Sequence, residues 1–370
     1  MIDKVRSFIV PAAVFQSVIV GGAYGTGREV VEFISSYGAL GGLLVICVIA
    51  VGFSLILAVS FEFARTFAVW DYRHFLRELL GRGWVAYELM FGALLIIILA
   101  VTGAAAGRVL HDAFYIPTTV GVGLLFALVV ALNFFGREIV KQTLTVGAIV
   151  LSTVLLAYCA LVFADAGGEI VARITLSSVE PGWWLSGMKF AVYNSALIPV
   201  IVYCASDVPD RATAIGAGLL AGFLGIFPAL IFHLTFIAGY PEVVDQAIPT
   251  YWMLERIGVA LAVPVYVIVL FATIVQTGVG VLQGLNERLD GWFEDAHGSR
   301  LPPSVHALIA GAVLVASLFL SKLGIVALVA RGYGTLAWGF FAVFTIPVIT
   351  IGVRKIRAAG SPPGRGESGR

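Results

Sequence analysis

Hydrophobic and polar positions follow one another along this chain in long blocks. Apolar stretches of about 20 residues or more are separated by short polar connections, and about 20 apolar residues suffice for one helix to cross a bilayer. The pattern therefore predicts an all-α integral membrane protein. Its ten predicted membrane-spanning helices cover 8–37, 39–65, 84–110, 117–135, 139–163, 184–206, 211–238, 258–286, 302–321 and 323–353.

The first apolar stretch contains a segment that opposes helix formation. In "GGAYGTGREVVEF", residues 21–33, four of the first seven residues are glycine, and Arg28, Glu29 and Glu32 follow at once. Each glycine in a helix interior costs about 0.8–1 kcal/mol relative to alanine. We therefore expect the first helix to break here. Thr26 is the expected N-cap of the second half-helix, because Glu29 stands at capping-box spacing from it.

The sixth apolar stretch carries a second defect. Asn194 and Ser195 are weak helix formers, and Pro199 removes a helical hydrogen bond and clashes with the preceding turn. Five crossings are an odd number, so the second group of five helices enters the membrane from the opposite side. This topology predicts a five-plus-five inverted repeat, with halves 1–163 and 164–357 and broken helices 1 and 6. Interrupted helices at corresponding positions indicate a transporter binding site.

Three connecting or terminal segments differ from the apolar stretches. Residues 66–83 are amphipathic and basic, and 240–257 are expected to form a short surface helix. The Gly/Pro/Ser-rich tail 358–370 is expected to be disordered on the cytoplasmic side.

Composition and charge support the membrane assignment. The chain is 60% hydrophobic and 12% charged, whereas soluble domains carry about 25% charged residues. Most Lys and Arg residues fall on the side of the N-terminus, which predicts a multi-pass protein of the cell membrane with both termini in the cytoplasm. The net charge of +1, without a basic cluster, gives no reason to expect a nucleic-acid partner.

The broken helices supply the candidate binding residues for a small-molecule substrate. A half-helix that begins near Thr26 would present free N–H groups to an anionic group such as a carboxylate. Two alternatives stay open: the glycines serve close helix packing, and Arg28 and Glu32 simply pair with each other. The candidate substrate-binding residues are Gly22, Ala23, Tyr24, Gly25, Thr26, Gly27, Arg28, Glu29, Tyr193, Asn194 and Ser195.

On these residues the chain resembles the YkvI-like membrane proteins of the amino acid–polyamine–organocation superfamily. The resemblance rests on residues 23–29, "AYGTGRE", on Phe33 and Tyr37-Gly38, and on Tyr193-Asn194. Tyr24 stands where the family usually has Phe, and Gly25 where it usually has Ala. The resemblance implies a LeuT-type fold and secondary active transport. The implied function is sodium- or proton-coupled symport of a small organic solute (an amino acid, an amine or a related compound) by alternating access.

The resemblance also implies a sodium site between the break in the first helix and the eighth helix. Its residues would be Gly21, Thr273, Gln276 and Thr277. The last three share one helix face, and oxygen ligands suit a hard cation. Related sodium transporters have hydroxyls at the later two positions, so Gln276 is a departure. Hydrogen bonding to neighbouring helices is the alternative role, and no cofactor other than sodium is expected.

Four further ionisable residues within the predicted helices are candidates for gating or proton transfer, because charges inside membranes are functional by default. Glu32 and Arg331 would form an outer gate, with Glu29 as another partner of Arg331. Lys189 would attract an anionic group, or only extend to the membrane surface. His233 would relay protons or be a hydrogen-bonded structural residue.

Two other functions remain as alternatives to transport. A solute sensor on a transporter fold, like the spore germinant receptors, would bind its ligand without moving it. "ASDVPDR" offers Asp207 and Asp210 for a magnesium-dependent lipid enzyme, but Asp210 is also a plausible N-cap. Because a second acidic cluster is missing, we expect no enzymatic activity.

Overall fold

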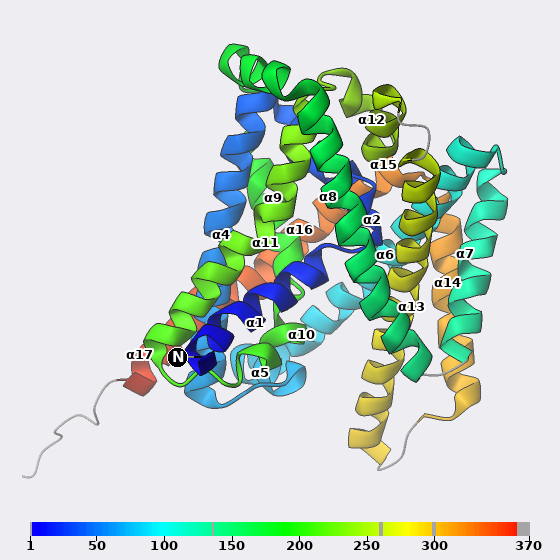
Figure 1. The fold of residues 1–370 in the computed structure, drawn as a ribbon. Helices are drawn as coiled ribbons and strands as arrows, with labels where there is room; N and C mark the ends of the chain where they lie inside the picture. Colours follow the sequence, from blue (N-terminus) through cyan, green and yellow to red (C-terminus); the bar gives the residue numbers. More distant parts are fainter. Residues whose placement is uncertain (1, 135–136, 259–261, 298–300, 361–370) are drawn as a thin grey trace, which may run out of the picture.

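The computed structural model describes residues 2–134, 137–258, 262–297 and 301–360, and in these ranges the chain is helical without a β-strand (Figure 1). The tail that we expected to be disordered lies outside these ranges from residue 361 onward. The helices are α1 (Ile2–Ile19), α2 (Gly22–Gly25), α3 (Arg28–Phe33), α4 (Ala39–Phe67), α5 (Tyr72–Leu80), α6 (Trp84–Phe114), α7 (Thr118–Phe134), α8 (Arg137–Leu176), α9 (Trp183–Ser195), α10 (Ile198–Ile201), α11 (Arg211–Ile237), α12 (Pro249–Ile257), α13 (Ala262–His297), α14 (Pro303–Ser321), α15 (Ile325–Ala327), α16 (Gly334–Phe340) and α17 (Val353–Gly360).

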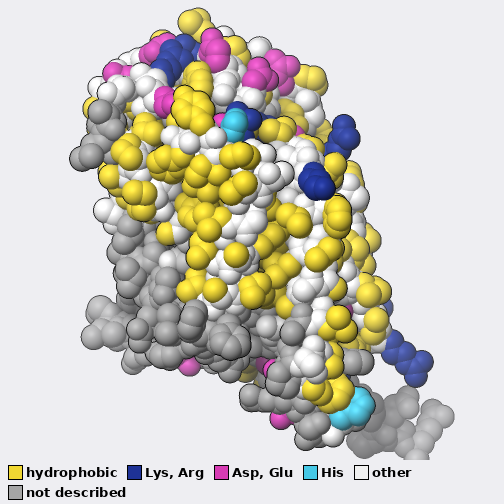
Figure 2. Space-filling model, turned by 90° about the vertical axis from the view of Figure 1, so that its right-hand side faces the viewer, with side chains coloured by type: hydrophobic (Ala, Val, Ile, Leu, Met, Phe, Trp, Pro, Cys, Tyr) yellow, Lys and Arg dark blue, Asp and Glu magenta, His cyan; other side chains and the backbone are white. Residues whose placement is uncertain are grey.

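Among the described residues, six helical segments are long and apolar enough to cross a membrane. They are Ala39–Phe67, Tyr72–Phe114, Thr153–Leu176, Arg211–Ile237, Ala262–Gly291 and Ile325–Ala359, and the bent pair Trp183–Ser195 and Ile198–Ala205 makes a seventh. Ser7–Ile19, Thr118–Leu132 and Leu308–Ser321 are apolar but shorter. One of these segments overlaps each predicted range, while the total of ten crossings stays a prediction. Apolar side chains cover the middle height of the face in Figure 2, with charged groups gathered above them.

Both helices that the sequence predicted to be broken are interrupted. α1 ends at Ile19, the single turn of α2 follows, and α3 begins only at Arg28. α9 ends at Ser195, and α10 continues at an angle of 44°. Pro199 lies in the first turn of α10, where its missing N–H costs no helical hydrogen bond.

Gly27, and not Thr26 as predicted, is the N-cap of α3. Gly27 has φ +79°, a left-handed conformation that glycine adopts without a steric penalty. A Cβ at this position would also lie 2.4 Å from the Phe236 ring. The Thr26 hydroxyl accepts the N–H of Arg28 at 3.2 Å, while the Glu29 side chain bonds elsewhere, so the capping box does not form.

The packing of the helices agrees with a symmetric arrangement of two halves. α1 packs on α11, and α9 packs on α4. In the predicted halves α1 corresponds to α9 and α4 corresponds to α11, so each of these two contacts is the counterpart of the other. α4 and α11 themselves approach closely at Gly222, where a Cβ would lie 2.2 Å from the backbone nitrogen of Ser54. The inverted repeat stays a prediction, and its proposed boundary at 163 lies within α8, which continues to Leu176.

The two ends of the bundle carry different short elements. The start of the chain, α5 and α17 lie at one end, and α12 lies at the other (Figure 1). α12 is the short helix expected in 240–257, and α5 lies in the amphipathic, basic connection 66–83. We refer below to the α5 end and the α12 end of the molecule.

Candidate functional site

A cavity of about 1140 Å³ lies between the helices and reaches both helix breaks. At the α5 end its walls include the exposed Asp71 together with Arg73 and Arg288. At its buried end they include Tyr24 and Tyr193, which flank the breaks in the first and sixth helices. The cavity therefore opens at the α5 end and stops where the two helices are interrupted.

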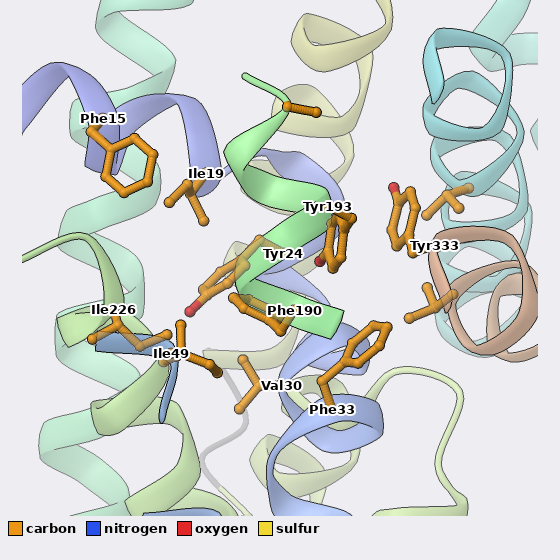
Figure 3. Close-up of a cluster of buried hydrophobic side chains, with 14 of the residues drawn as sticks. Phe15, Ile19, Tyr24, Val30, Phe33, Ile49, Phe190, Tyr193, Ile226 and Tyr333 are labelled. Carbon is orange, nitrogen blue, oxygen red and sulfur yellow. The ribbon is translucent and has the colours of Figure 1, made fainter. Parts of the chain in front are cut away.

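The buried end of the cavity contains a carboxyl group. Glu29 on α3 is 7% exposed, and the Tyr193 hydroxyl donates a hydrogen bond to its Oε2 at 2.6 Å. The Tyr193 ring stacks on Tyr333, with centroids 4.8 Å apart and planes inclined by 10°. Figure 3 shows Tyr193 facing Tyr333, with Phe33 and Phe190 beside them. An acidic group and aromatic rings from three separate segments thus meet at the breaks.

The backbone of the first break is hydrogen-bonded mainly within the protein. The N–H of Gly25 bonds to Gly21 O at 3.3 Å, and the N–H of Gly27 bonds to Tyr24 O at 2.9 Å. On the carbonyl side, Gly25 accepts from the Tyr266 hydroxyl at 2.9 Å, and Thr26 accepts from the N–H of Thr250 at 3.2 Å. Because lipid cannot satisfy free backbone groups, these bonds explain how the break persists. They also occupy N–H groups that the sequence analysis assigned to an anionic ligand.

Arg28 does not line the cavity and points toward the α12 end instead. Its guanidinium donates to Val244 O at 2.8 Å and Gln246 O at 3.0 Å, and it pairs with Glu32 at 2.5 Å. Arg28 therefore fastens α3 to the connection before α12. The pairing of Arg28 with Glu32 is the structural alternative that the sequence left open.

The residues of the predicted sodium site meet at the cavity wall. Gly21, Thr273, Gln276 and Thr277 all line the cavity. A Cβ on Gly21 would lie 3.6 Å from Thr277 Oγ1. The hydroxyls of Thr273 and Thr277 donate to the carbonyls one turn earlier, at 2.8 and 3.1 Å, so their oxygens remain able to coordinate a cation. Sodium binding itself stays a prediction, and no cluster of three His, Cys, Asp or Glu side chains suited to a metal occurs among the described residues.

The remaining candidates lie away from the cavity walls. The ring nitrogens of His233 bond to Ser35 Oγ and to Ala39 O, both at 2.9 Å, which agrees with the structural role, while a part in proton transfer stays a prediction. Lys189 lies 5.8 Å from the centre of the Trp338 ring. Arg331 is exposed, and Glu32 pairs with Arg28, so the predicted outer gate between Arg331 and Glu32 is absent from this conformation.

Among the other predicted binding residues, only some contribute side chains to the cavity. Asn194 lines it, and its amide also donates to Phe190 O at 3.0 Å. Ser195 is fully buried and donates to Ala191 O at 2.6 Å. Gly22 and Ala23 belong to the single turn of α2, but the side chain of Ala23 lies outside the described part of the structure.

Two tyrosines of the site were not among the residues predicted from the sequence. Tyr333 lines the cavity against Tyr193, and Tyr266 supports the break from α13. The only sequence signal for Tyr333 is its position between Gly332 and Gly334. In the structure it ends a π-helical segment, Leu328–Tyr333. Such local irregularities of membrane helices are frequent at functional sites.

Comparison with known proteins identifies the fold. No protein-family model and no curated protein matches the sequence. Three solved structures match nearly the whole chain. The inward-facing conformation of Mhp1 is 14% identical, with 95% of this chain and 77% of that chain covered and a TM-score of 0.55. A manganese transporter mutant from Eremococcus coleocola is 12% identical, with 97% and 89% covered and a TM-score of 0.53. A Na+-coupled sialic acid symporter in its substrate-bound outward-open state is 12% identical, with 95% and 87% covered and a TM-score of 0.52. At such low identity the likeness concerns the fold alone, and it supports a LeuT-type fold.

Proposed function

We propose that this protein is a secondary active transporter that moves a small organic solute by alternating access, in symport with sodium or protons. The solute would be an amino acid, an amine or a related compound. The observation that carries the proposal is the cavity of about 1140 Å³, which opens at one end of the molecule and stops at two interrupted helices. Helix interruptions at the membrane midplane are where secondary transporters bind their solutes.

The two ends of the molecule differ as alternating access requires. At the α5 end the cavity reaches the exposed Asp71. Toward the α12 end the stacked rings of Tyr193 and Tyr333 and the clamp formed by Arg28 close the path. With the orientation predicted from the basic residues, this conformation faces the cytoplasm. The fold shared with a manganese transporter and a Na+-coupled sialic acid symporter adds general support.

The structure offers a candidate for each coupling ion. Thr273 and Thr277 present hydroxyl oxygens beside Gly21 at the first break, which suits sodium. Glu29 supplies a buried carboxyl group that lines the same cavity, which suits a proton, since ionisable groups inside membrane proteins mark ion and proton pathways.

A labelling experiment tests alternating access without knowledge of the solute. Ser17→Cys places a thiol on the cavity wall, and Phe33→Cys places one at a 4% exposed position beyond the Tyr193 ring. Each is introduced after replacement of Cys47, Cys159 and Cys204 and is labelled with N-ethylmaleimide in nanodiscs. Leu176→Cys, at a position that is 86% exposed, serves as the reference.

We expect the two labelling rates to change in opposite directions when potassium is replaced by sodium or when the pH is changed. Each rate is divided by the rate at residue 176 under the same condition, because a rise in pH increases the reactive thiolate at every site. If residues 17 and 33 keep their rates under every condition, the protein does not alternate and the proposal is wrong. If both sites label as fast as residue 176 under every condition, both ends are open together and the proposal is wrong.

A further inference from the structure

Glu29 is a buried acid that lacks a positively charged partner. Its carboxyl group is 7% exposed and bonds to the hydroxyl of Tyr193. Within the described part of the chain, no Lys, Arg or His side chain forms an ion pair with it. A carboxylate removed from water is strongly destabilised unless it is paired. A positive charge that enters the cavity would supply the missing partner.

The basic residues near the cavity are already engaged with other groups. Arg28 directly precedes Glu29 on α3, but its guanidinium is held by Val244 O, Gln246 O and Glu32. At the mouth, Arg73 donates to Gly291 O at 2.6 Å. Arg288 donates to the Tyr72 hydroxyl at 2.8 Å. Arg73 and Arg288 line the cavity at the α5 end, and neither forms an ion pair with Glu29 at the buried end, so, among the described residues, a negative charge on Glu29 would have no basic side chain bonded to it.

Three backbone N–H groups at the first break are not available to an anionic group. The N–H groups of Gly25, Gly27 and Arg28 already bond to acceptors of the protein itself. Glu29 lines the same end of the cavity and would repel a carboxylate. This arrangement favours a cation over the carboxylate that the sequence led us to expect at the first break.

The wall of the cavity suits an apolar body. Leu94, Leu95, Ile98, Leu155, Ile231 and Phe232 line the cavity. The ring of Tyr24 lies at the buried end, and its face is attractive to a cation. An apolar cavity with a few convergent polar groups is the usual form of a small-molecule site.

We propose that the solute is an organic cation, an amine without a carboxylate, whose ammonium group binds Glu29 at the junction of the two helix breaks. This inference rests on the proposed transport function and deepens it by assigning the charge of the solute. Tyr193 acts as a positioning residue, because its hydroxyl holds the carboxyl group of Glu29 toward the cavity end. The apolar wall binds the rest of the solute.

The test compares matched compounds on the purified full chain in nanodiscs with a potassium salt. The cations are butylamine, butane-1,4-diamine, phenethylamine and choline. Each of the first three is compared with the alcohol or diol of the same skeleton, and phenethylamine also with phenylalanine and 3-phenylpropionate. Ligand binding to the folded state raises its apparent stability, so thermal unfolding at increasing concentrations reports the affinity of each compound.

We expect at least one cation to stabilise the wild type, and its uncharged counterpart to bind about 30-fold or more weakly, because a buried charge pair loses one member. Glu29→Gln should weaken the cation by a similar factor. Glu62→Gln is the matched control, because Glu62 is also buried, at 4% exposure, but pairs with Arg65 away from the cavity. It should leave the affinity unchanged. The wild-type comparison of amine and alcohol stands even if Glu29→Gln does not fold.

Three results would overturn the inference. Phenylalanine or 3-phenylpropionate binds while none of the cations does; a cation binds Glu29→Gln as tightly as the wild type; or no cation binds at millimolar concentration. None of these results affects the labelling test of alternating access, so the assignment of the solute and the transport function fail separately.

Discussion

Arg28 should be the main fastening of the α12 end, and its replacement by methionine tests this. The side chain is buried at 3% exposure. It makes three bonds: 2.8 Å to Val244 O, 3.0 Å to Gln246 O and 2.5 Å to Glu32. Arg28→Met preserves most of the apolar stem and removes only the guanidinium. The variant therefore isolates the contribution of these bonds.

The expected loss of stability follows from burial. Removal of one member of a buried ion pair costs about 3–5 kcal/mol, because the other member is left unpaired. Two features of the structure favour a loss at the lower end of this range. The Glu32 side chain is 26% exposed, so water compensates part of the lost pairing. Arg28 Nε is buried without a hydrogen-bond partner among the described atoms, and its removal relieves a desolvation cost. We expect a loss of about 3 kcal/mol.

The assay is reversible unfolding by SDS in mixed micelles, followed by tryptophan fluorescence. Arg331→Met is the control, because Arg331 is exposed and such surface changes usually stay within about 0.5 kcal/mol. A thiol at Val243, a position that is 0% exposed, should label faster in Arg28→Met because the connection before α12 is released. Equal stability of the two variants, with an unchanged labelling rate at residue 243, would refute this account of the α12 end.

Three further predictions concern packing, His233 and sodium. Gly222→Ala should cost about 1–3 kcal/mol of stability by overpacking, because its Cβ would overlap the backbone of Ser54. Gly123→Ala is the control in the same SDS titration and should not destabilise, because the space around Gly123 is open. An equal loss of stability in the two variants would contradict the close packing of α4 and α11. His233→Ala should cost about 1–3 kcal/mol of stability for each buried partner left unsatisfied, namely Ser35 Oγ and Ala39 O. His111→Ala, at an exposed position, is the control. An equal loss of stability in the control would show that the hydrogen bonds of His233 contribute nothing. Thr277→Val should weaken stabilisation by sodium chloride relative to potassium chloride about tenfold or more, since loss of one hydrogen-bonding or ligating group costs about 1.4 kcal/mol. Thr345→Val, which removes a buried hydroxyl without a hydrogen-bond partner in the described structure, should respond to sodium like the wild type; wild-type protein that shows no sodium effect would exclude this coupling ion.

Much of the architecture could be predicted from the sequence, because bilayer thickness converts apolar length directly into helices. The interruptions were predictable for a similar local reason. Four glycines within residues 21–27, and Pro199 after Asn194 and Ser195, weaken a helix whatever surrounds it. The breaks that the structure shows at 20–27 and 196–197 follow these residues.

The roles of the polar side chains depended on partners distant in sequence. Thr26 and Glu29 have capping-box spacing, but the φ +79° of Gly27 and the contacts with Phe236 and Thr250 shift the cap by one residue. Glu29 then bonds to Tyr193, 164 positions away. Spacing along the chain cannot reveal such a contact, because it depends on how α3 and α9 pack.

The sequence by itself therefore determined that this is an apolar helical membrane protein and where its helices are weakest, because both properties arise within a single turn or a single span. Only the tertiary structure decided which charges are paired. It directs Arg28 to the carbonyls before α12 and leaves Glu29 at the cavity end with Tyr193. Arg28 and Glu29 are neighbours on one short helix, but one is paired and the other has no charged partner among the described residues. The reason is that the energy of a charge inside the membrane depends on the groups that other helices bring to it.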